Sequence, residues 1–293
     1  CPFIWKDFAK RGYNTGFSED EIGIGIFYRS IRIEPPFHFL GKGDDNMCYG
    51  TRRSFKMLLD NIENIAVAQK NRPYFHFTWA TKLSHNNFNK LHQGDGPLLE
   101  FLQFMATNGY LNHTALLILG DHGNRSPTQA QMNPAGKVEV RMPVFYLVLP
   151  DWFKAKYSQP FKNLQYNADS LTSPYDVYET LKLFMNLSQL RDTQSYKNAD
   201  TIINVRKPMS LFQKIPFDRS CLEAGVSLHW CVCRGARDER PAPTTTPEVR
   251  NDVTASVDFM NVKLKPVSTK CHPLALKETV SAYHIDNSVI STL

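Results

Sequence analysis

The sequence contains no apolar run that approaches the roughly 20 residues a helix needs to span a bilayer. It also lacks a stripe of one charge, since the net charge is +6 over 293 residues and the basic residues are scattered. A concentrated basic patch is the usual mark of nucleic-acid or membrane-surface binding. The sequence therefore predicts no nucleic-acid partner, and a membrane anchor only if one is encoded upstream.

No internal repeat is visible, and the chain opens without a Met or a signal peptide. Because residues 1–5 already read as the start of an ordered element, we expect upstream sequence to be missing. Core material is ample, with hydrophobic residues making up 42% of the chain and aromatic residues 12%. This composition argues against a globally disordered protein.

The six cysteines lack the paired Cys-x-x-Cys spacing of a zinc ribbon. Their even number favours disulfides in an oxidising compartment. For the group at Cys221, Cys231 and Cys233 we expect disulfides with Cys271 or Cys48, and the spacing leaves the connectivity open.

Two sequons point to the same compartment. We expect glycans at Asn112, in Asn-His-Thr, and at Asn186, in Asn-Leu-Ser. Asn124 begins a third sequon, but Pro127 follows it and makes it a poor acceptor. The sequence therefore predicts a glycoprotein of the extracellular space or the secretory lumen.

Strand-like apolar runs alternate with helical periodicities over roughly the first 215 residues, the pattern of an α/β sheet with crossover helices. Helical spacing covers residues 51–70; further helices are expected to be capped by Asp95 and by Ser173. The predicted strands cover residues 12–18, 74–79, 114–119 and 144–149.

The character of the sequence changes after Pro216. We expect an α/β domain over residues 1–218 and a Cys-containing C-terminal extension over residues 219–293. The stretch 236–252 is rich in Pro and Thr and is expected to be an exposed linker within the extension.

The strongest functional signal follows the apolar run at residues 114–119, which leads into Gly120-Asp121-His122-Gly123. We expect this run to be a central parallel strand buried on both faces. In open α/β sheets, functional groups gather at the carboxyl ends of strands. A carboxylate and an imidazole together suit Zn²⁺ or Mn²⁺, and Mg²⁺ or Ca²⁺ less well. The alternative is that Asp121 caps a turn and His122 is an ordinary loop residue.

Four further residues are candidates for the same site. Glu19 and Asp20 end a predicted strand, with a solvated turn as the alternative. Arg125 and Lys137 carry charges suited to an anionic substrate, although the sequence favours a surface role for each.

Several spaced motifs resemble the alkaline phosphatase/sulfatase superfamily. Residues 116–123 resemble the strand and metal-binding turn of those enzymes, and residues 136–143 resemble their downstream Glu-to-Pro segment. A closer resemblance is to an uncharacterised animal family within that superfamily, domain-of-unknown-function family 229. The segments that carry it are residues 1–12, 19–20, 83–85, 112–123, 171–172, 215–221 and 229–233.

The resemblance implies a three-layer α/β/α domain, incomplete at its N-terminus, whose site binds one or two divalent metals. It places His85 where relatives carry a ligand or a substrate-binding His. The implied metal ligands are therefore Asp121, His122 and His85. His76 and His92, which flank His85, are expected to be structural.

The resemblance also implies an activated Ser, Thr or modified Cys that attacks a phosphoryl or sulfuryl centre, while metals stabilise the attacking and leaving oxygens. No residue of this chain takes that place, since Thr15, Ser84 and Ser126 lack the expected context. The implied substrate is a small anionic ester or a sulfated or phosphorylated glycan.

Two functional hypotheses follow. The first is a metal-dependent hydrolase of phosphate or sulfate esters that is inactive as this fragment because the nucleophile region is absent. The second is a non-catalytic secreted pseudoenzyme that acts as a binding module. A misannotated gene product is a third reading. An upstream strand with an Asp, followed by a Ser, Thr or Cys at a helix start, separates the first from the second.

Overall fold

The computed structural model describes residues 3–21, 25–26, 38–40, 48–85, 88–125, 134–191, 208–227, 230–233, 239–279, 281–285 and 288–292. The chain forms two units, residues 1–230 and 231–293, whereas the predicted boundary lay at residue 218. No helix in the described ranges is long and apolar enough to cross a bilayer.

The strand β1 (Asn14–Glu19) lies between β2 (His38–Leu40) and β5 (Tyr74–Trp79) and pairs in parallel with both. Aromatic residues and a Thr dominate β5, and such side chains favour extended backbone. The register aligns Glu19 with Trp79, so the two strands end at the same edge. Both predicted strands are confirmed.

The strand β6 (Leu116–Leu119) pairs antiparallel with β7 (Phe145–Val148). The prediction of a central parallel strand buried on both faces is therefore wrong in its pairing and burial, since Leu119 is 50% exposed. An apolar run is compatible with a parallel or an antiparallel neighbouring strand, so apolarity alone could not reveal the relative direction of β6 and β7. The antiparallel register places the start of β7 beside the end of β6.

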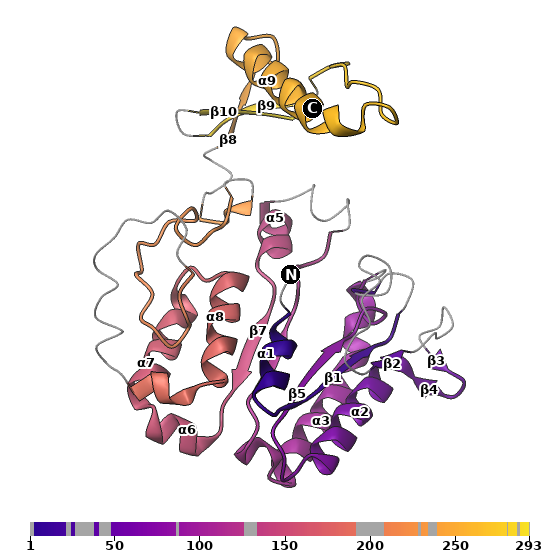
Figure 1. The fold of residues 1–293 in the computed structure, drawn as a ribbon, viewed down its shortest axis with the longest axis vertical. Coiled ribbons are helices and arrows are strands. Elements are labelled where there is room, and N and C mark those ends of the chain that lie inside the picture. The colour runs from indigo at the N-terminus through magenta and orange to yellow at the C-terminus, as the bar shows by residue number, and fades with distance from the viewer. Residues whose placement is uncertain are drawn as a thin grey trace. The chain divides into compact units, whose positions relative to one another are not determined.

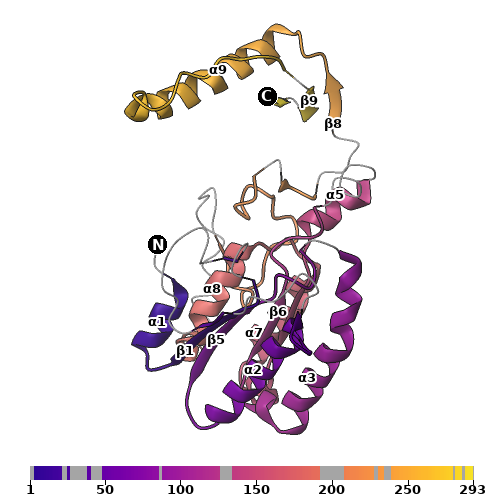
Figure 2. The same ribbon diagram turned by 90° about the vertical axis from the view of Figure 1, so that its right-hand side faces the viewer.

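Two helices, α2 (Ser54–Ala68) and α3 (Asp95–Thr107), cover one side of the strands. They run side by side in Figure 2 and share a core that β6 also joins. That core contains Leu59, Ala66, Phe101 and Met105, with Leu116 packed against it. The structure corrects one detail, because Gly94 is the N-cap of α3 and Asp95 is already its first helical residue.

Three further helices lie on the other side of the strands (Figure 1): α6 (Asp151–Lys156), α7 (Ser158–Tyr166) and α8 (Pro174–Phe184). Their core contains Leu149, Phe153, Tyr157, Leu190 and Phe212. Ser173 caps α8 in a reciprocal capping box with Asp176, as its position before Pro174 predicts. Helices thus cover both sides of the strands, and the predicted α/β fold is confirmed.

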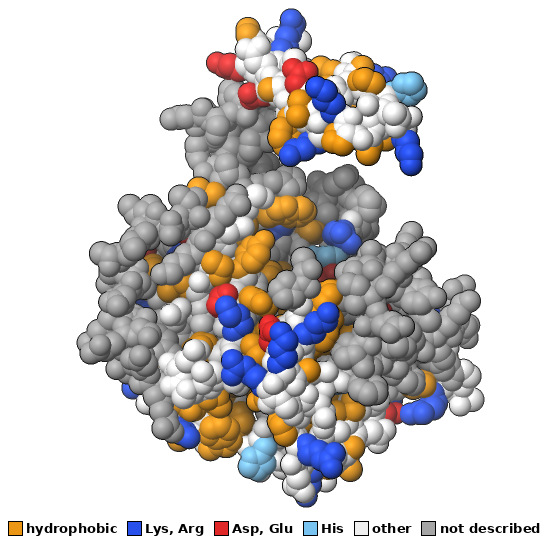
Figure 3. All heavy atoms as spheres, in the orientation of Figure 1, with side chains coloured by type: hydrophobic (Ala, Val, Ile, Leu, Met, Phe, Trp, Pro, Cys, Tyr) orange, Lys and Arg blue, Asp and Glu red, His pale blue; other side chains and the backbone are white. Residues whose placement is uncertain are grey.

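The remaining elements of the first unit are short. They are α1 (Ile4–Lys10), β3 (Cys48–Tyr49), β4 (Arg52–Arg53), α5 (Pro134–Arg141) and the 3₁₀ helices η1 (Phe88–Gly94), η2 (Tyr110–Asn112), η3 (Asn167–Asp169) and η4 (Leu187–Arg191). Basic and acidic side chains gather on the face that contains α1 (Figure 3), where Lys10, Arg11 and Lys182 line a shallow cleft with Asp7.

The second unit is a three-stranded antiparallel sheet of β8 (Glu239–Ala242), β9 (Ser281–Ile285) and β10 (Ser288–Thr292), together with the helix α9 (Pro247–Leu264) and the 3₁₀ helix η7 (Lys265–Val267). A small core of Val249, Val253 and Ala282 joins helix and sheet. The predicted linker at 236–252 is wrong, since it contains β8 and the first turn of α9. Thr246 accepts a hydrogen bond from the Val249 amide, and Pro247 follows at the first helical position, a start signal that the Pro- and Thr-rich composition obscured.

Candidate functional site

The end of β1 carries two buried acids. Glu19 is 0% exposed and Asp20 is 1% exposed, so the alternative of a solvated turn is wrong. Asp20 Oδ1 accepts hydrogen bonds from the backbone amides of Thr81, at 2.7 Å, and Lys82, at 3.3 Å. These bonds tie the end of β1 to the turn that follows β5, because both strands end at one edge of the sheet.

Among the residues that the structure describes, each acid also has a carboxylate oxygen without a hydrogen-bond partner, Oε2 in Glu19 and Oδ2 in Asp20. Burial raises the pKa of Glu19 to about 6. The Ile26 amide donates a hydrogen bond to Glu19 Oε1 at 2.7 Å, which lowers the pKa and partly offsets the effect of burial. Burial raises the pKa of Asp20 as well. A buried carboxylate oxygen in this state needs a proton or a cation beside it.

The turn after β5 places Lys82 and His85 at the same edge of the sheet. Lys82 Nζ lies 3.2 Å from Glu21 Oε2 in a largely buried ion pair. The His85 amide donates to the Thr81 carbonyl at 3.1 Å, so His85 lies one turn from the residue that contacts Asp20. Its side chain is exposed.

A polar network lies behind this edge, within the sheet and its covering helix. Ser18 Oγ lies 2.8 Å from His76 Nε2 and accepts a hydrogen bond of 2.6 Å from Asn61 Nδ2. Burial lowers the pKa of His76 to about 4, so the ring is neutral at physiological pH. A Cβ at Gly16 would lie 2.5 Å from His76 Nδ1, which explains the glycine in the strand. His76 is thus a partly buried member of a polar network within the sheet.

Asp121 and His122 follow β6 on a turn that points their polar atoms at each other. Asp121 Oδ1 accepts from the His122 amide at 2.9 Å, and Asp121 Oδ2 lies 3.2 Å from His122 Nε2. His122 Nδ1 lies 2.7 Å from the Gly123 carbonyl, which can only accept, so Nδ1 carries the proton. In a neutral ring Nε2 is then a lone pair that faces a carboxylate oxygen.

This arrangement fits a metal ion. Two ligand atoms at about 2.0–2.1 Å from a tetrahedral Zn²⁺ stand about 3.4 Å apart. The distance of 3.2 Å between Asp121 Oδ2 and His122 Nε2 is close to that value.

The helix α5 forms the wall behind this turn. The Gly123 amide donates to the Val140 carbonyl at 3.0 Å, and a Cβ at Gly123 would lie 2.0 Å from the Glu139 carbonyl oxygen. Only glycine allows this approach. On the same helix, the Arg141 guanidinium lies 5.8 Å from the centre of the Trp230 ring. The two segments that carry the superfamily resemblance, residues 116–123 and 136–143, therefore meet in space.

The structure brings the predicted residues together only in part. Within the described ranges, three ligand atoms of His, Cys, Asp or Glu gather within 4.8 Å only at Cys221, Cys231 and Cys233. Asp121 and His122 thus form a pair to which neither His85 nor Glu19 nor Asp20 adds a third atom at that distance. Arg125 is exposed, and the Lys137 side chain lies outside what the structure describes. The metal assignment of Asp121, His122 and His85 stays a prediction.

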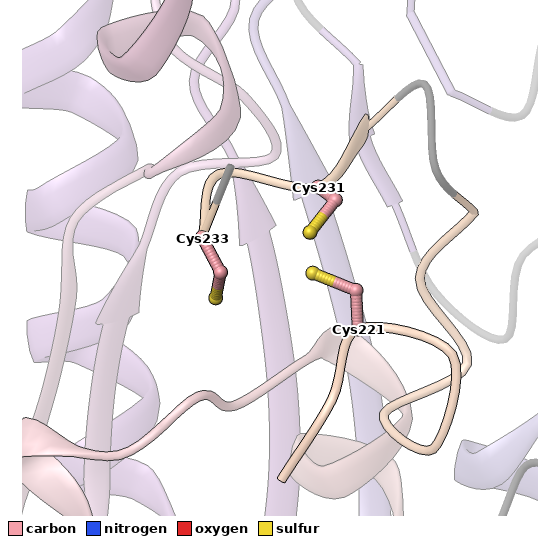
Figure 4. Close-up of side chains that lie close together, drawn as sticks. All are labelled: Cys221, Cys231 and Cys233. Carbon is pink, nitrogen blue, oxygen red and sulfur yellow. The ribbon is translucent and has the colours of Figure 1, made fainter. Parts of the chain in front are cut away.

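The cysteine group corrects the predicted disulfides. Cys221 and Cys231 are both disulfide-bonded. Cys48, Cys233 and Cys271 are not disulfide-bonded. Because Cys1 could pair with only one of the two, Cys221 and Cys231 are bonded to each other, and the expected partners Cys48 and Cys271 are wrong. Figure 4 shows their sulfur atoms turned toward each other, with Cys233 beside them. Their separation of ten residues was the unused signal in the sequence.

Comparison with known families matches residues 1–280 of this chain to the family described as "Protein of unknown function (DUF229)". The chain belongs to this family. The resemblance drawn from the spaced motifs is thereby confirmed at the family level.

A solved structure that is similar to part of the chain is the crystal structure of the lipoteichoic acid synthase LtaP from Listeria monocytogenes. The identity is 16% and the TM-score is 0.40, over 51% of this chain and 46% of that chain. The chain thus spans about half the length of that protein. No curated protein matches the chain.

Proposed function

We propose that the chain is the C-terminal part of a metal-dependent hydrolase domain of the alkaline phosphatase/sulfatase type. Asp121 and His122 hold a divalent cation, and the domain acts on phosphate or sulfate esters once the upstream nucleophile is present. The observation that carries the proposal is the Asp121 Oδ2 and His122 Nε2 pair, which faces a common point with the Nδ1 proton directed away.

Contacts between the first residues of β1, β5 and β6 support the proposal that the candidate site residues lie at one edge of the sheet. Tyr74, the first residue of β5, places its hydroxyl 3.1 Å from Thr114 Oγ1, just before β6. The Asn14 amide at the start of β1 donates to the Pro73 carbonyl at 2.9 Å. Since β1, β5 and β6 begin next to one another, we expect the residues after their carboxyl ends to face one cleft.

The buried acids support the same reading. The unpartnered oxygens of Glu19 and Asp20 are the kind of group that a cation or a shared proton satisfies. With a pKa raised to about 6, Glu19 is able to hold or release a proton close to neutral pH. Asp20 positions the Thr81–Lys82 backbone and, through it, the turn that carries His85.

The roles of the chain's residues follow from their chemistry. A cation bound at Asp121 and His122 would supply stabilisation of negative charge on the ester oxygens. His85 is proposed as a further ligand or a contact to the substrate. Arg125 and Lys137 are proposed contacts for the anionic group of a small ester or of a sulfated or phosphorylated glycan. The metal is drawn from Zn²⁺, Mn²⁺, Mg²⁺ and Ca²⁺, with the imidazole favouring the first two.

The disulfide supports the proposed location, because disulfides persist in oxidising compartments. We accordingly propose an extracellular or secretory-lumen protein, with glycans at Asn112 and Asn186. Asn112 is exposed, and Ser188 Oγ donates to Asn186 Oδ1 at 2.6 Å within the second sequon.

The test is a hydrolysis assay of residues 1–293 alone and of the same chain joined to its upstream sequence. Aryl phosphate, phosphodiester and aryl sulfate substrates would be tried with each of the four metals. We expect no turnover by residues 1–293, and turnover by the longer chain that falls at least 100-fold in Asp121→Ala. Asp151→Ala, an exposed carboxylate on α6, is the control. A folded, metal-bound longer chain without turnover would favour the pseudoenzyme, and turnover unaffected by Asp121→Ala would contradict the proposed site.

A further inference from the structure

The cysteine group combines a disulfide with a free thiol. The Sγ atoms of Cys221, Cys231 and Cys233 all lie within 4.8 Å of one another (Figure 4). Cys221 and Cys231 are bonded and buried, at 5% and 6% exposure. Cys233 is free and exposed. A free thiol this close to a disulfide is the arrangement from which thiol–disulfide exchange proceeds.

We propose that Cys233 is the attacking thiol of an internal disulfide-exchange site. Its thiolate attacks Cys221 Sγ, the bond from Cys221 to Cys231 breaks, and a bond from Cys221 to Cys233 forms. Cys231 leaves as the thiolate and takes up the proton that Cys233 released. One disulfide and one thiol are present before and after, so the step requires neither an oxidant nor a reductant.

The sequence separation selects Cys221 as the sulfur that is attacked. Attack there exchanges a loop closed by ten residues of separation for one closed by twelve, which changes the loop-closure entropy very little. Attack on Cys231 would close a ring with Val232 as the sole residue between the two cysteines. The chain therefore has two disulfide states of similar loop size, 221–231 and 221–233.

Solvent exposure determines which cysteine reacts first with thiols and disulfides in the surrounding solution. The disulfide sulfurs are buried, whereas Cys233 is open to solvent. Small thiols and disulfides from outside would thus react first at Cys233, which passes the exchange to Cys221. Because the thiolate is the attacking species, the exchange accelerates as the pH rises.

The exchange site is also connected through Trp230 to α5, the helix that lies behind the proposed metal site. Trp230 immediately precedes Cys231 and holds Arg141 of α5 against its ring. Through Val140, α5 accepts the hydrogen bond from Gly123 in the Asp121 turn. This consequence rests on the proposed function, but the exchange chemistry itself does not.

The test maps the free thiol by two-step alkylation of residues 1–293. The protein is kept at pH 8.5, acidified, labelled with N-ethylmaleimide, then reduced and labelled with iodoacetamide. Trypsin releases all three cysteines in one peptide, residues 220–234, and tandem mass spectrometry locates the first label. We expect that label on Cys233 in some molecules and on Cys231 in others. A first label confined to Cys233 would overturn the proposal.

Single variants make the test independent of the position of the equilibrium. Both variants are equilibrated with oxidised glutathione, which accepts the two electrons that a new disulfide releases. In Cys231→Ser, we expect a disulfide between Cys221 and Cys233 in most molecules; in Cys233→Ser, we expect Cys231 to stay unlabelled. Thermal melts followed by circular dichroism establish that each variant is folded. A folded Cys231→Ser variant with both remaining thiols labelled would also overturn the proposal. Metal binding plays no part in these readouts, so their failure would leave the proposed function untouched.

Discussion

The two halves of the proposed site are built in opposite ways. At the end of β1, Glu19 and Asp20 are buried. The Ile26 amide donates to Glu19, and the Thr81 amide, just after β5, donates to Asp20. After β6, the Asp121 side chain is 48% exposed and that of His122 is 32% exposed, and a glycine turn positions them against α5. The first half contains buried carboxylate oxygens that have no hydrogen-bond partner among the described residues. The second half presents a pair of ligand atoms to solvent. Substitutions in the first should therefore change stability, and substitutions in the second should change binding.

The largest expected difference lies between Asp20→Ala and Asp121→Ala. Removing Asp20 leaves the Thr81 and Lys82 amides without their acceptor, which we expect to lower the free energy of unfolding by about 3 kcal/mol. Asp121→Ala should stay within about 0.5 kcal/mol, as is usual for exposed positions. Urea denaturation in EDTA measures both. Asp20→Asn keeps an acceptor oxygen and should recover most of the loss; equal losses for Asp20→Ala and Asp121→Ala would end the distinction between the two halves.

The glycine turn at Gly123 provides the next test of the difference between the two halves. In Gly123→Ala, the new Cβ meets the Glu139 backbone oxygen at 2.0 Å, so the turn or α5 must move. We expect a loss of about 1–3 kcal/mol in the free energy of unfolding, and weaker metal binding. Gly96→Ala in α3 is the control, because its Cβ would meet nothing within 4 Å and alanine favours the helix. Tight metal binding by Gly123→Ala would show that the turn geometry is not required.

The buried half should also respond to pH. The pKa of Glu19 is raised from 4.5 to about 6 in the folded state, so its contribution to stability is full below pH 4.5 and is lost as the pH rises through 6. This shift corresponds to about 2 kcal/mol. Without metal, Glu19→Gln should therefore be more stable than the parent at pH 7 by up to that amount and show little gain at pH 4.5.

His76 provides the internal control for this measurement. Its pKa is lowered to about 4, so its contribution has the opposite sign, being present above pH 6.5 and lost as the pH falls toward 4. Because the parent and Glu19→Gln share His76, their difference in stability isolates Glu19. A difference that does not vary between pH 4.5 and 7 would contradict the assigned burial of the Glu19 charge.

The smallest expected effect concerns glycans. In protein recovered from a secretory host, we expect higher occupancy at Asn112 and Asn186 than at Asn124, which precedes Pro127 in a poor sequon and lies next to the Asp121 turn. Glycopeptide mass spectrometry gives the occupancy of all three. Substantial occupancy of Asn124 would argue against a functional cleft at that turn.

Much of the fold was predictable from local pattern. The aromatic and β-branched run of β5, the helical spacing of α2 and the Ser173-Pro174 start of α8 are signals within a few residues of the elements they specify. The pairing of β6 was not, because strand direction depends on partner residues 26 to 32 positions away along the chain. The Thr246-Pro247 start of α9 was present in the sequence but hidden by the composition around it.

The site divides in the same manner. The Asp121-His122 pair and the glycine beside it were visible as a motif after an apolar run. The burial of Glu19 and Asp20 was not, because it depends on the Thr81 amide and on packing from segments distant in sequence. The Cys221–Cys231 bond was missed because distant partners were favoured over one ten residues away.

The central claim is that Asp121 and His122 bind a divalent cation, and calorimetric titration of residues 1–293 with Mn²⁺ tests it most directly. Mn²⁺ prefers oxygen and nitrogen ligands over thiolates, so the cysteine group does not compete for it. Parent, Asp121→Ala, His122→Ala and the control Asp151→Ala would be titrated side by side. We predict one Mn²⁺ per chain in the parent and the control, with affinity at least tenfold weaker in each of the two site variants. Unchanged Mn²⁺ affinity in both Asp121→Ala and His122→Ala, or no Mn²⁺ binding by a folded parent chain, would contradict the claim.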